Sequence, residues 1–339
     1  MIFPNDDIKE CNWDYVFECL ESEIKKRKYS LKTLKIYENW IRRFLLFSCC
    51  DDYKLLNQQN AIDFLNDLIF IDKASVYSQN QAYNALLFLY KNILGKGFGE
   101  IRKVKSKLKK KLNPYIPLVI SKDEINLVFD YLEGQFNLIC KLLYGCGLKL
   151  SECINLRVRC FDFEKCALTI FNDRKNEIDR VISLPESILD LLKLQMCEVT
   201  SLYNKDLEKK FFDGAFLFED FYKDYEDYDT SVRMDLDWQW FFPQTELVLI
   251  PETYKYKRSH VHVSLVQKKI RIASSAANVK KRVTANTFRH SFACHLLENG
   301  CDVHTIQKIM GHKNINTTMI YTTIVNDNAL KMVGSPLDF

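Results

Sequence analysis

Three residues near the C-terminus, Arg289, His312 and Tyr321, have the types and spacing to carry out chemistry on a phosphate ester. A tyrosine hydroxyl can attack phosphorus and form a covalent ester. The transition state of that attack gathers negative charge on its non-bridging oxygens, which an arginine fork and an imidazolium stabilise by charge-assisted hydrogen bonds. A lysine on a hairpin, such as Lys175, can supply the proton that the leaving oxygen needs. This scheme requires no metal and no cofactor.

The segments around these residues predict successive helices that bring the three side chains together. Arg289 falls in a helix that begins near residue 284, and Asn286 shares one face of that helix with it. Gly311 is expected to end the following helix, so that His312 lies just past a helix end. Tyr321 comes nine residues later, in a further short helix. Turns between the helices can therefore converge Arg289, His312 and Tyr321.

The rest of the chain predicts mostly helices with one small β element. Ala167–Phe171 and Arg180–Leu184 have the composition of short strands, and the polar segment between them predicts a hairpin with Lys175 near its tip. Residues 200–245 are acidic, rich in aromatics and expected to be irregular. The fold class is therefore mainly α with a small β-hairpin or sheet, an α+β arrangement.

The N-terminal part, residues 13–95, predicts a small all-helical domain. Ser30 is a good N-cap, and apolar residues follow it at helical spacing. Arg42 and Arg43 are expected on or beside the polar face of that helix, where they are candidates for contact with nucleic acid.

A basic segment separates the two halves, and residues 96–117 have the glycine and proline punctuation of an interdomain linker. The basic composition of this segment predicts either a linker exposed to solvent or a segment that runs along the phosphates of a nucleic acid. The run RKVKSKLKKK contains seven basic residues and no acid: Arg102, Lys103, Lys105, Lys107, Lys109, Lys110 and Lys111.

Length and composition limit the other possibilities. The 339 residues carry a formal net charge of +4 and fit two or three domains. No apolar run approaches the roughly 20 residues of a membrane-spanning helix. The first residues do not look like a secretory signal, so we expect a cytoplasmic protein with no membrane partner. The 12 cysteines are scattered without a CxxC pair, which favours reduced, buried thiols over a zinc site.

Taken together, the motifs resemble those of tyrosine recombinases of the phage integrase family, and are most similar to integron integrases. The resemblance covers nearly the whole length. It rests on YSLKTLKIYENWIRRF and QNQAYNALLFLYKNILGK in the first half, and on LLYGCGLKLSECINLRVRCFDF, DRVISLPES, RHSFACHLLENG and GHKNINTTMIYT in the second. WQWFFPQ followed by HVHVSLVQKKIRIA resembles the region that follows an extra segment in integron integrases. By this resemblance, the extra segment lies at about residues 200–245 of this chain.

The resemblance assigns roles residue by residue. Tyr321 matches the nucleophile, Arg289 the second arginine and His312 the second histidine of the family. Lys175 matches the hairpin lysine, and Arg174 is the alternative because the family's glycine-rich turn is replaced there.

Two positions depart from the family pattern. Lys149 stands where the family has its first arginine, and Asn286 where it has a histidine. Lysine keeps the charge but loses the planar fork, and asparagine cannot carry a proton as imidazole does. Glu152 is expected to support the site. His290 and His295 are expected to be structural, with one of them packing beside Arg289.

By resemblance, the chain cuts and rejoins DNA through a 3′-phosphotyrosine and works as a homo-tetramer. Its partners would be double-stranded sites and folded single-stranded hairpins of gene cassettes, whose extrahelical bases aromatics such as Trp238 and Trp240 would hold. Residues 13–95 would clamp DNA, 118–327 would be catalytic, and 328–339 would form a tail. The alternative is a homologue that binds DNA without cleaving it, because Lys149 and Asn286 replace family residues.

Overall fold

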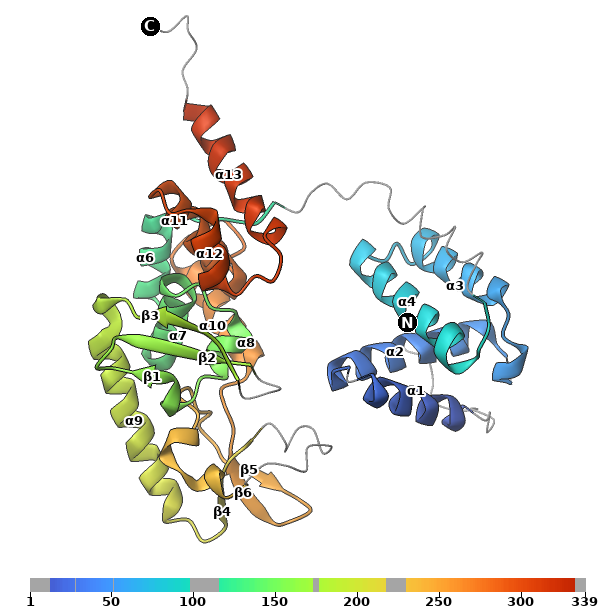
Figure 1. The fold of residues 1–339 in the computed structure, drawn as a ribbon, viewed down its shortest axis with the longest axis horizontal. Coiled ribbons are helices and arrows are strands. Elements are labelled where there is room, and N and C mark those ends of the chain that lie inside the picture. The colour runs from blue at the N-terminus through green and yellow to red at the C-terminus, as the bar shows by residue number, and fades with distance from the viewer. Residues whose placement is uncertain are drawn as a thin grey trace, which may run out of the picture. The chain divides into compact units, whose positions relative to one another are not determined.

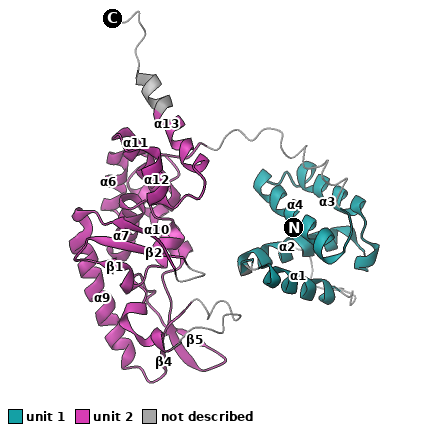
Figure 2. Cartoon of the chain, viewed as in Figure 1, with its two compact units in different colours: residues 1–115 teal, residues 116–339 magenta. Residues whose placement is uncertain are grey.

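The computed structural model describes residues 13–27, 29–50, 52–97, 116–172, 177–217 and 230–332, with the backbone alone at 31, 230 and 326–332. The chain divides into two compact units, Met1–Tyr115 and Ile116–Phe339 (Figure 2). The mainly helical α+β fold predicted from the sequence is confirmed (Figure 1).

In its described ranges, the first unit contains helices and no strand. Ser30 caps the second helix as predicted, accepting a hydrogen bond from the backbone N–H of Thr33 at 3.1 Å. Leu20, Ile41 and Leu86 are among the fully buried side chains where the helices meet. The elements are α1 (Asp14–Lys26), α2 (Leu31–Ser48), the 3₁₀ turn η1 (Tyr53–Leu55), α3 (Gln58–Phe70), α4 (Val76–Phe88) and the π turn η2 (Leu89–Ile93).

The second unit combines helices with two small sheets, and its elements follow in chain order. Its first half has α6 (Lys122–Asp130), α7 (Gly134–Gly145), α8 (Leu150–Ile154), η3 (Val158–Cys160), β1 (Phe161–Asp162), β2 (Ala167–Phe171), β3 (Ile178–Ser183), η4 (Glu186–Ile188) and α9 (Leu189–Leu207). Its second half has β4 (Phe212–Ala215), η5 (Thr230–Met234), η6 (Leu236–Trp238), β5 (Val248–Ile250), β6 (Lys255–Arg258), α10 (Val263–Ala276), α11 (Ala285–Glu298), α12 (Val303–Met310) and α13 (Asn316–Met332).

The predicted hairpin is present as two strands of an antiparallel sheet with the order β1–β2–β3. Leu168 pairs with Ile182, and both side chains are buried in the main core of the unit. Strand β2 has the predicted bounds, whereas β3 begins two residues earlier and ends one residue earlier than predicted. Strand β3 is mostly exposed, so its first residues lack the alternation of apolar and polar side chains that indicates a half-buried strand.

The prediction that residues 200–245 are irregular is wrong in part. Helix α9 continues to Leu207, and Phe212–Ala215 forms a strand that pairs in parallel with β6. A buried ion pair between Asp206 and Arg258 joins the end of α9 to β6, with Arg258 Nε 2.8 Å from the carboxylate. Figure 1 shows this sheet at one end of the second unit and α11–α13 at the other.

Candidate active site

Helix α11 places Arg289 at the centre of a polar cluster, which we call the site cluster: Lys149, Glu152, Arg180, Arg289, His290, His312 and Tyr321. The Arg289 side chain is buried, with 5% of its residue surface exposed. Its guanidinium donates to the carbonyl oxygen of Gly147 and, at 2.7 Å, to that of Met310. A further N–H group points at Nε2 of His312, 3.0 Å away. One side chain therefore joins the turn before α8 to the end of α12.

His312 follows the glycine that ends α12, as predicted. Gly311 has φ of 63°, and a Cβ there would lie 2.6 Å from Arg180 Nη1, so glycine suits both the backbone and the space. The Nδ1 atom of His312 lies 2.9 Å from the Thr318 hydroxyl. Burial, followed by the positive charges of Arg289 and Lys149, lowers the pKa of His312 to about 4. The imidazole is therefore neutral at neutral pH, accepting at Nε2 from Arg289 and donating from Nδ1.

The carboxylate of Glu152 accepts hydrogen bonds from two cationic residues of the cluster, Arg180 and Lys149. Glu152 Oε2 accepts from Arg180 Nη2 at 2.8 Å and from the backbone N–H of Lys149 at 2.9 Å. Its other oxygen accepts from the Lys149 ammonium, also at 2.9 Å. Burial alone would raise the pKa of Glu152, but hydrogen bonds and charge from Arg180, and hydrogen bonds from Lys149, lower it to about 2. The Lys149 side chain stays 47% exposed, so its charge can still meet an incoming anion.

Tyr321 reaches the same cluster from α13. Only 2% of its surface is exposed, and its hydroxyl lies 2.8 Å from Nδ1 of His290. Its ring is roughly parallel to that of His312, with centroids 6.4 Å apart and an interplanar angle of 17°. Arg289, His312 and Tyr321, which the sequence predicts to converge, therefore lie together in the structure.

Asn286 is not part of this cluster. It lies in the first turn of α11 and is exposed, and its side chain forms no hydrogen bond to another described residue. Lys175 and its alternative Arg174 lie outside the described residues, as does the basic run of residues 102–111.

Arg180 is a member of the cluster that sequence reasoning missed. It lies on β3, donates from Nε to the Ile309 carbonyl at 2.7 Å, and links the hairpin strand to α12. Within the sequence it is one charged residue in a mostly exposed strand, so no local signal marks it. The interpretation of His290 as a packing residue beside Arg289 is incomplete, because its imidazole contacts Tyr321 across two helices.

The two tryptophans of the extra segment contact arginines. Trp240 is 5% exposed, its indole N–H donates to the Arg258 carbonyl at 3.0 Å, and the Arg157 guanidinium lies 3.2 Å from its ring centroid. Trp238 is partly exposed, with the Arg159 guanidinium 3.7 Å from its ring centroid. The burial of Trp240 leaves no ring face for a base, so the structure gives no support to that part of the prediction.

Arg42 and Arg43 in the first unit are exposed and paired. Arg42 Nη2 lies 2.7 Å from Glu38, and Arg43 Nη2 lies 3.1 Å from Asp72. Each guanidinium also lies near an aromatic ring, that of Phe17 or Trp40 respectively. Exposed pairs of this kind contribute little to stability and exchange readily for another anion.

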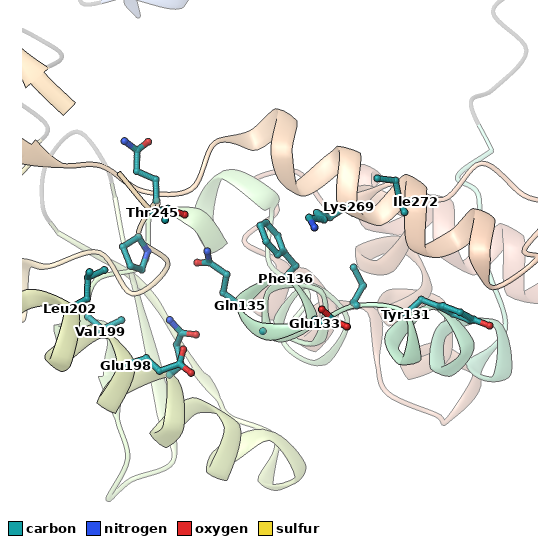
Figure 3. A pocket seen from close by; sticks show the side chains of 15 residues that line it. Tyr131, Glu133, Gln135, Phe136, Glu198, Val199, Leu202, Thr245, Lys269 and Ile272 are labelled. Atoms are coloured by element: carbon teal, nitrogen blue, oxygen red, sulfur yellow. The ribbon is translucent and has the colours of Figure 1, made fainter. Parts of the chain in front are cut away.

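One cavity of about 630 Å³ opens beside α9, α10 and the turn before α7 (Figure 3). Its lining includes Gln135, Glu198 and Lys269, and none of the site cluster. Within the described part of the chain, no group of three or more His, Cys, Asp or Glu side chains could hold a metal ion. No helix in the ranges searched is long and apolar enough to cross a bilayer.

A helical unit is followed by an α+β unit in which a buried arginine, a partly buried histidine and a buried tyrosine meet, an arrangement that fits the class of tyrosine recombinases. Sequence comparison agrees: residues 119–327 match the phage integrase family, and residues 16–100 match the SAM-like N-terminal domain of phage integrases. The chain belongs to the phage integrase family.

Known proteins resemble this chain over nearly its full length. An "Integrase/recombinase" of Escherichia coli is 31% identical over 95% of this chain and 93% of its own. The tyrosine recombinase XerA of Thermococcus onnurineus is 27% identical over 93% of both chains. Among solved structures, the XerH site-specific recombinase in a post-cleavage complex with its difH substrate has a similar fold, with a TM-score of 0.60 and 18% identity over 97% of this chain and 90% of that one.

Proposed function

We propose that this protein is a site-specific DNA recombinase that cuts and rejoins strands through a covalent bond between Tyr321 and a 3′-phosphate. The observation that carries the proposal is the site cluster, in which Arg289 donates to His312 at 3.0 Å and the Tyr321 ring stacks at 6.4 Å from that imidazole. The family relationship points to the same reaction class.

The charges of the cluster suit a phosphodiester. Arg289 is a buried cation, Arg180 is a mostly buried one and Lys149 is half-exposed, whereas Glu152, with 15% of its side chain exposed, is the carboxylate that they share. Positive charge therefore exceeds negative charge around His312, and it adds to burial, the larger cause, in lowering the pKa of that imidazole. A bound phosphate would supply the missing negative charge and accept hydrogen bonds from Arg289.

In the proposed reaction, Tyr321 attacks phosphorus and the bond to the 5′-oxygen breaks. Lys175 on the hairpin would donate the proton to that oxygen, as the resemblance implies. No hydrolysis is required, because the 5′-hydroxyl of another strand can attack the phosphotyrosine and restore a diester. Residues 118–327 would carry this chemistry, while 13–95 and the basic linker would hold the DNA.

At a finer level, we propose an integron-integrase-like recombinase that integrates and excises gene cassettes. A homo-tetramer would act on double-stranded sites and on folded single-stranded hairpins, and the tail of residues 328–339 would dock on a neighbouring subunit. Trp238, which is partly exposed, is a better candidate than Trp240 for contact with an extrahelical base.

The alternative is a homologue that binds DNA without cutting it. Two observations favour it: Asn286 is exposed and apart from the cluster, and the Lys149 ammonium is hydrogen-bonded to Glu152. Loss of one aimed donor costs on the order of 3 kcal/mol in the barrier, about a hundredfold in rate.

A covalent capture assay separates the two. Duplexes bound by the protein are selected from a randomised pool, a nick is placed near the centre to trap the cleaved strand, and the products are run on a denaturing gel. We expect an adduct that disappears in Tyr321→Phe and persists in Tyr144→Phe. Tyr144 is a matched control, because its hydroxyl also contacts a histidine of α11, at 2.9 Å. Tight binding without any adduct in the wild type would establish the binding protein instead.

Substrate form is tested with the selected sequence. The same site is offered as a duplex and as a folded single strand with extrahelical bases. An integron-integrase-like protein forms adduct with both, and a strict preference for the duplex would contradict the finer proposal.

A further inference from the structure

The Tyr321 hydroxyl is in contact with an imidazole on a different helix. His290 on α11 and Tyr321 on α13 are 31 residues apart, and Nδ1 of one lies 2.8 Å from the hydroxyl oxygen of the other. Their ring centroids are 5.7 Å apart and the rings are tilted by 46°. The contact therefore lies at the atom from which a proton must leave when Tyr321 attacks phosphorus.

The charge state of His290 suits a proton acceptor. Burial, and then the positive charge of Arg289, lower the pKa of His290 to about 4. The charged and titratable groups beside it include Arg289 on its own helix, Tyr321 on α13 and His312 after α12. At neutral pH the ring is neutral, so Nδ1 accepts from Tyr321 when the ring proton is on Nε2. A phosphate bound by Arg289 would offset its charge and raise the basicity of His290 during the reaction.

The neighbouring groups are less suited to this task. His312 already accepts at Nε2 from Arg289, and its Nδ1 is bonded to Thr318. Arg289 is a donor only. The amide of Asn286 cannot take up a proton, and it lies exposed in the first turn of α11.

We infer that His290 is a catalytic base of this protein, which accepts the phenolic proton of Tyr321 while the tyrosine oxygen bonds to DNA phosphorus. The inference rests on the proposed function. In cleavage, the bond between the Tyr321 oxygen and phosphorus forms, the bond from phosphorus to the 5′-oxygen breaks, and the phenolic proton moves to Nδ1. The leaving oxygen takes its proton from Lys175.

Rejoining reverses each transfer. The incoming 5′-hydroxyl attacks phosphorus and gives its proton to Lys175. The bond between phosphorus and Tyr321 breaks, and the imidazolium of His290 returns its proton to the phenolate. The pair ends in its starting state, so one histidine serves both half-reactions.

His290→Asn is the main test, because the amide oxygen of Asn can take the place of Nδ1 as an acceptor but cannot carry a proton. On the nicked duplex that the wild type selects, we expect its adduct to form about a hundredfold more slowly at neutral pH. The matched control is His295→Asn on the same helix, because His295 Nδ1 contacts the Tyr144 hydroxyl at 2.9 Å away from the reacting atoms. We expect its rate to stay within about twofold of the wild type.

The pH profile separates a base from a structural residue. Between about pH 7 and 9 the wild-type rate should be nearly level, whereas the His290→Asn rate should rise about tenfold per pH unit because the phenol must lose its proton to solvent. His290→Ala should regain adduct formation when imidazole is added, in proportion to the neutral imidazole present. Circular dichroism confirms that each variant is folded.

Each outcome bears on a defined claim. A folded His290→Asn variant with the wild-type rate and pH profile would overturn the inference, as would equal losses in His290→Asn and His295→Asn. A wild-type chain that forms no adduct contradicts the proposed function itself, which is a different failure and is visible before any histidine is changed.

Discussion

The site cluster and the extra segment both bury arginines but give them different partners. Arg289 donates to backbone carbonyls and to the neutral ring of His312 at 3.0 Å. Arg157 lies over the Trp240 ring, 3.2 Å from its centroid, and donates to the carbonyls of Trp238 and Phe216. Both guanidiniums are buried away from water. They differ in that Arg289 donates to the neutral ring of His312, which a stronger hydrogen-bond acceptor can replace.

This difference indicates what each region does. A phosphate oxygen is a better acceptor for a guanidinium than a neutral imidazole nitrogen is, so under the proposed function an incoming diester would take over the hydrogen bond that Arg289 donates to His312. A buried ring face and loop carbonyls offer no such exchange, and a cation held there mainly fixes the loops around it. Burial of an arginine alone therefore does not mark a functional site.

The largest expected effect on stability lies in the extra segment. Asp206→Ala leaves Arg258 buried without its carboxylate, and we expect the free energy of unfolding to fall by about 3–5 kcal/mol. Asp190→Ala on the same helix is the control, because the Asp190 side chain is fully exposed and lies 4.0 Å from Lys193, so its loss should cost far less. Urea denaturation measures both, and equal losses would contradict the structural assignment of the Asp206–Arg258 pair.

Two matched substitutions test the comparison directly. Arg289→Lys keeps the charge but loses the fork, and should slow adduct formation by about 10²- to 10³-fold. Arg157→Lys should lower the melting temperature by several degrees and leave the adduct rate of the folded protein unchanged. Gel assays and thermal denaturation give both readouts, and the comparison fails if Arg157→Lys reduces the rate as strongly as Arg289→Lys.

A gain of activity is expected at the two positions that depart from the family. Lys149→Arg together with Asn286→His should speed adduct formation at least about tenfold, because one restores a fork and the other an imidazole. The rate is measured on the same nicked duplex. An unchanged rate would show that these positions have been assigned the wrong roles.

The pH dependence of stability should also reflect the site cluster. The pKa values of His290 and His312 fall from 6.5 to about 4 on folding, so the unfolded chain binds more protons between these values. Their contribution to stability is complete above pH 6.5 and is lost as the pH falls through 4. Glu152 has a pKa of about 2, so its own contribution is lost only below its ordinary value of 4.5.

The melting temperature should therefore fall between about pH 7 and pH 5 by several degrees. The fall should be smaller in a folded His290→Phe variant, which removes one of the two groups. Scanning calorimetry at a series of pH values makes the measurement, and an identical pH dependence in both proteins would contradict the assignment to His290.

A smaller effect is expected from the linker. Replacing the basic residues of 102–111 by glutamine should make the fall of DNA affinity with salt less steep, by about 0.9 in the log–log slope for each phosphate contact removed. An unchanged slope in a titration of binding against salt would mean that this segment does not touch phosphate.

The sequence predicted the parts of the site that depend on local signals. Gly311 marks the end of α12, which places His312, and the spacing to α13 places Tyr321. Helix periodicity and the Ser30 cap likewise predicted α2. These features follow from residues that are neighbours along one element.

The parts that were missed depend on contacts between distant elements. Arg180 reaches Glu152 from 28 positions away, and His290 meets Tyr321 only because α11 packs against α13. The resemblance implied base contacts for the tryptophans at 238 and 240, but a resemblance in sequence does not show that Arg157 covers one of the rings. Burial and tertiary pairing of this kind leave no periodic trace in a single sequence.

The most direct test of the account is to locate the covalent bond. The adduct formed on a nicked duplex is digested with protease and nuclease, and mass spectrometry identifies the amino acid that carries the nucleotide. We predict a 3′-linked nucleotide on Tyr321. Attachment to any other residue, or no attachment in a protein that binds the duplex tightly, would contradict the claim that this tyrosine is poised to attack DNA.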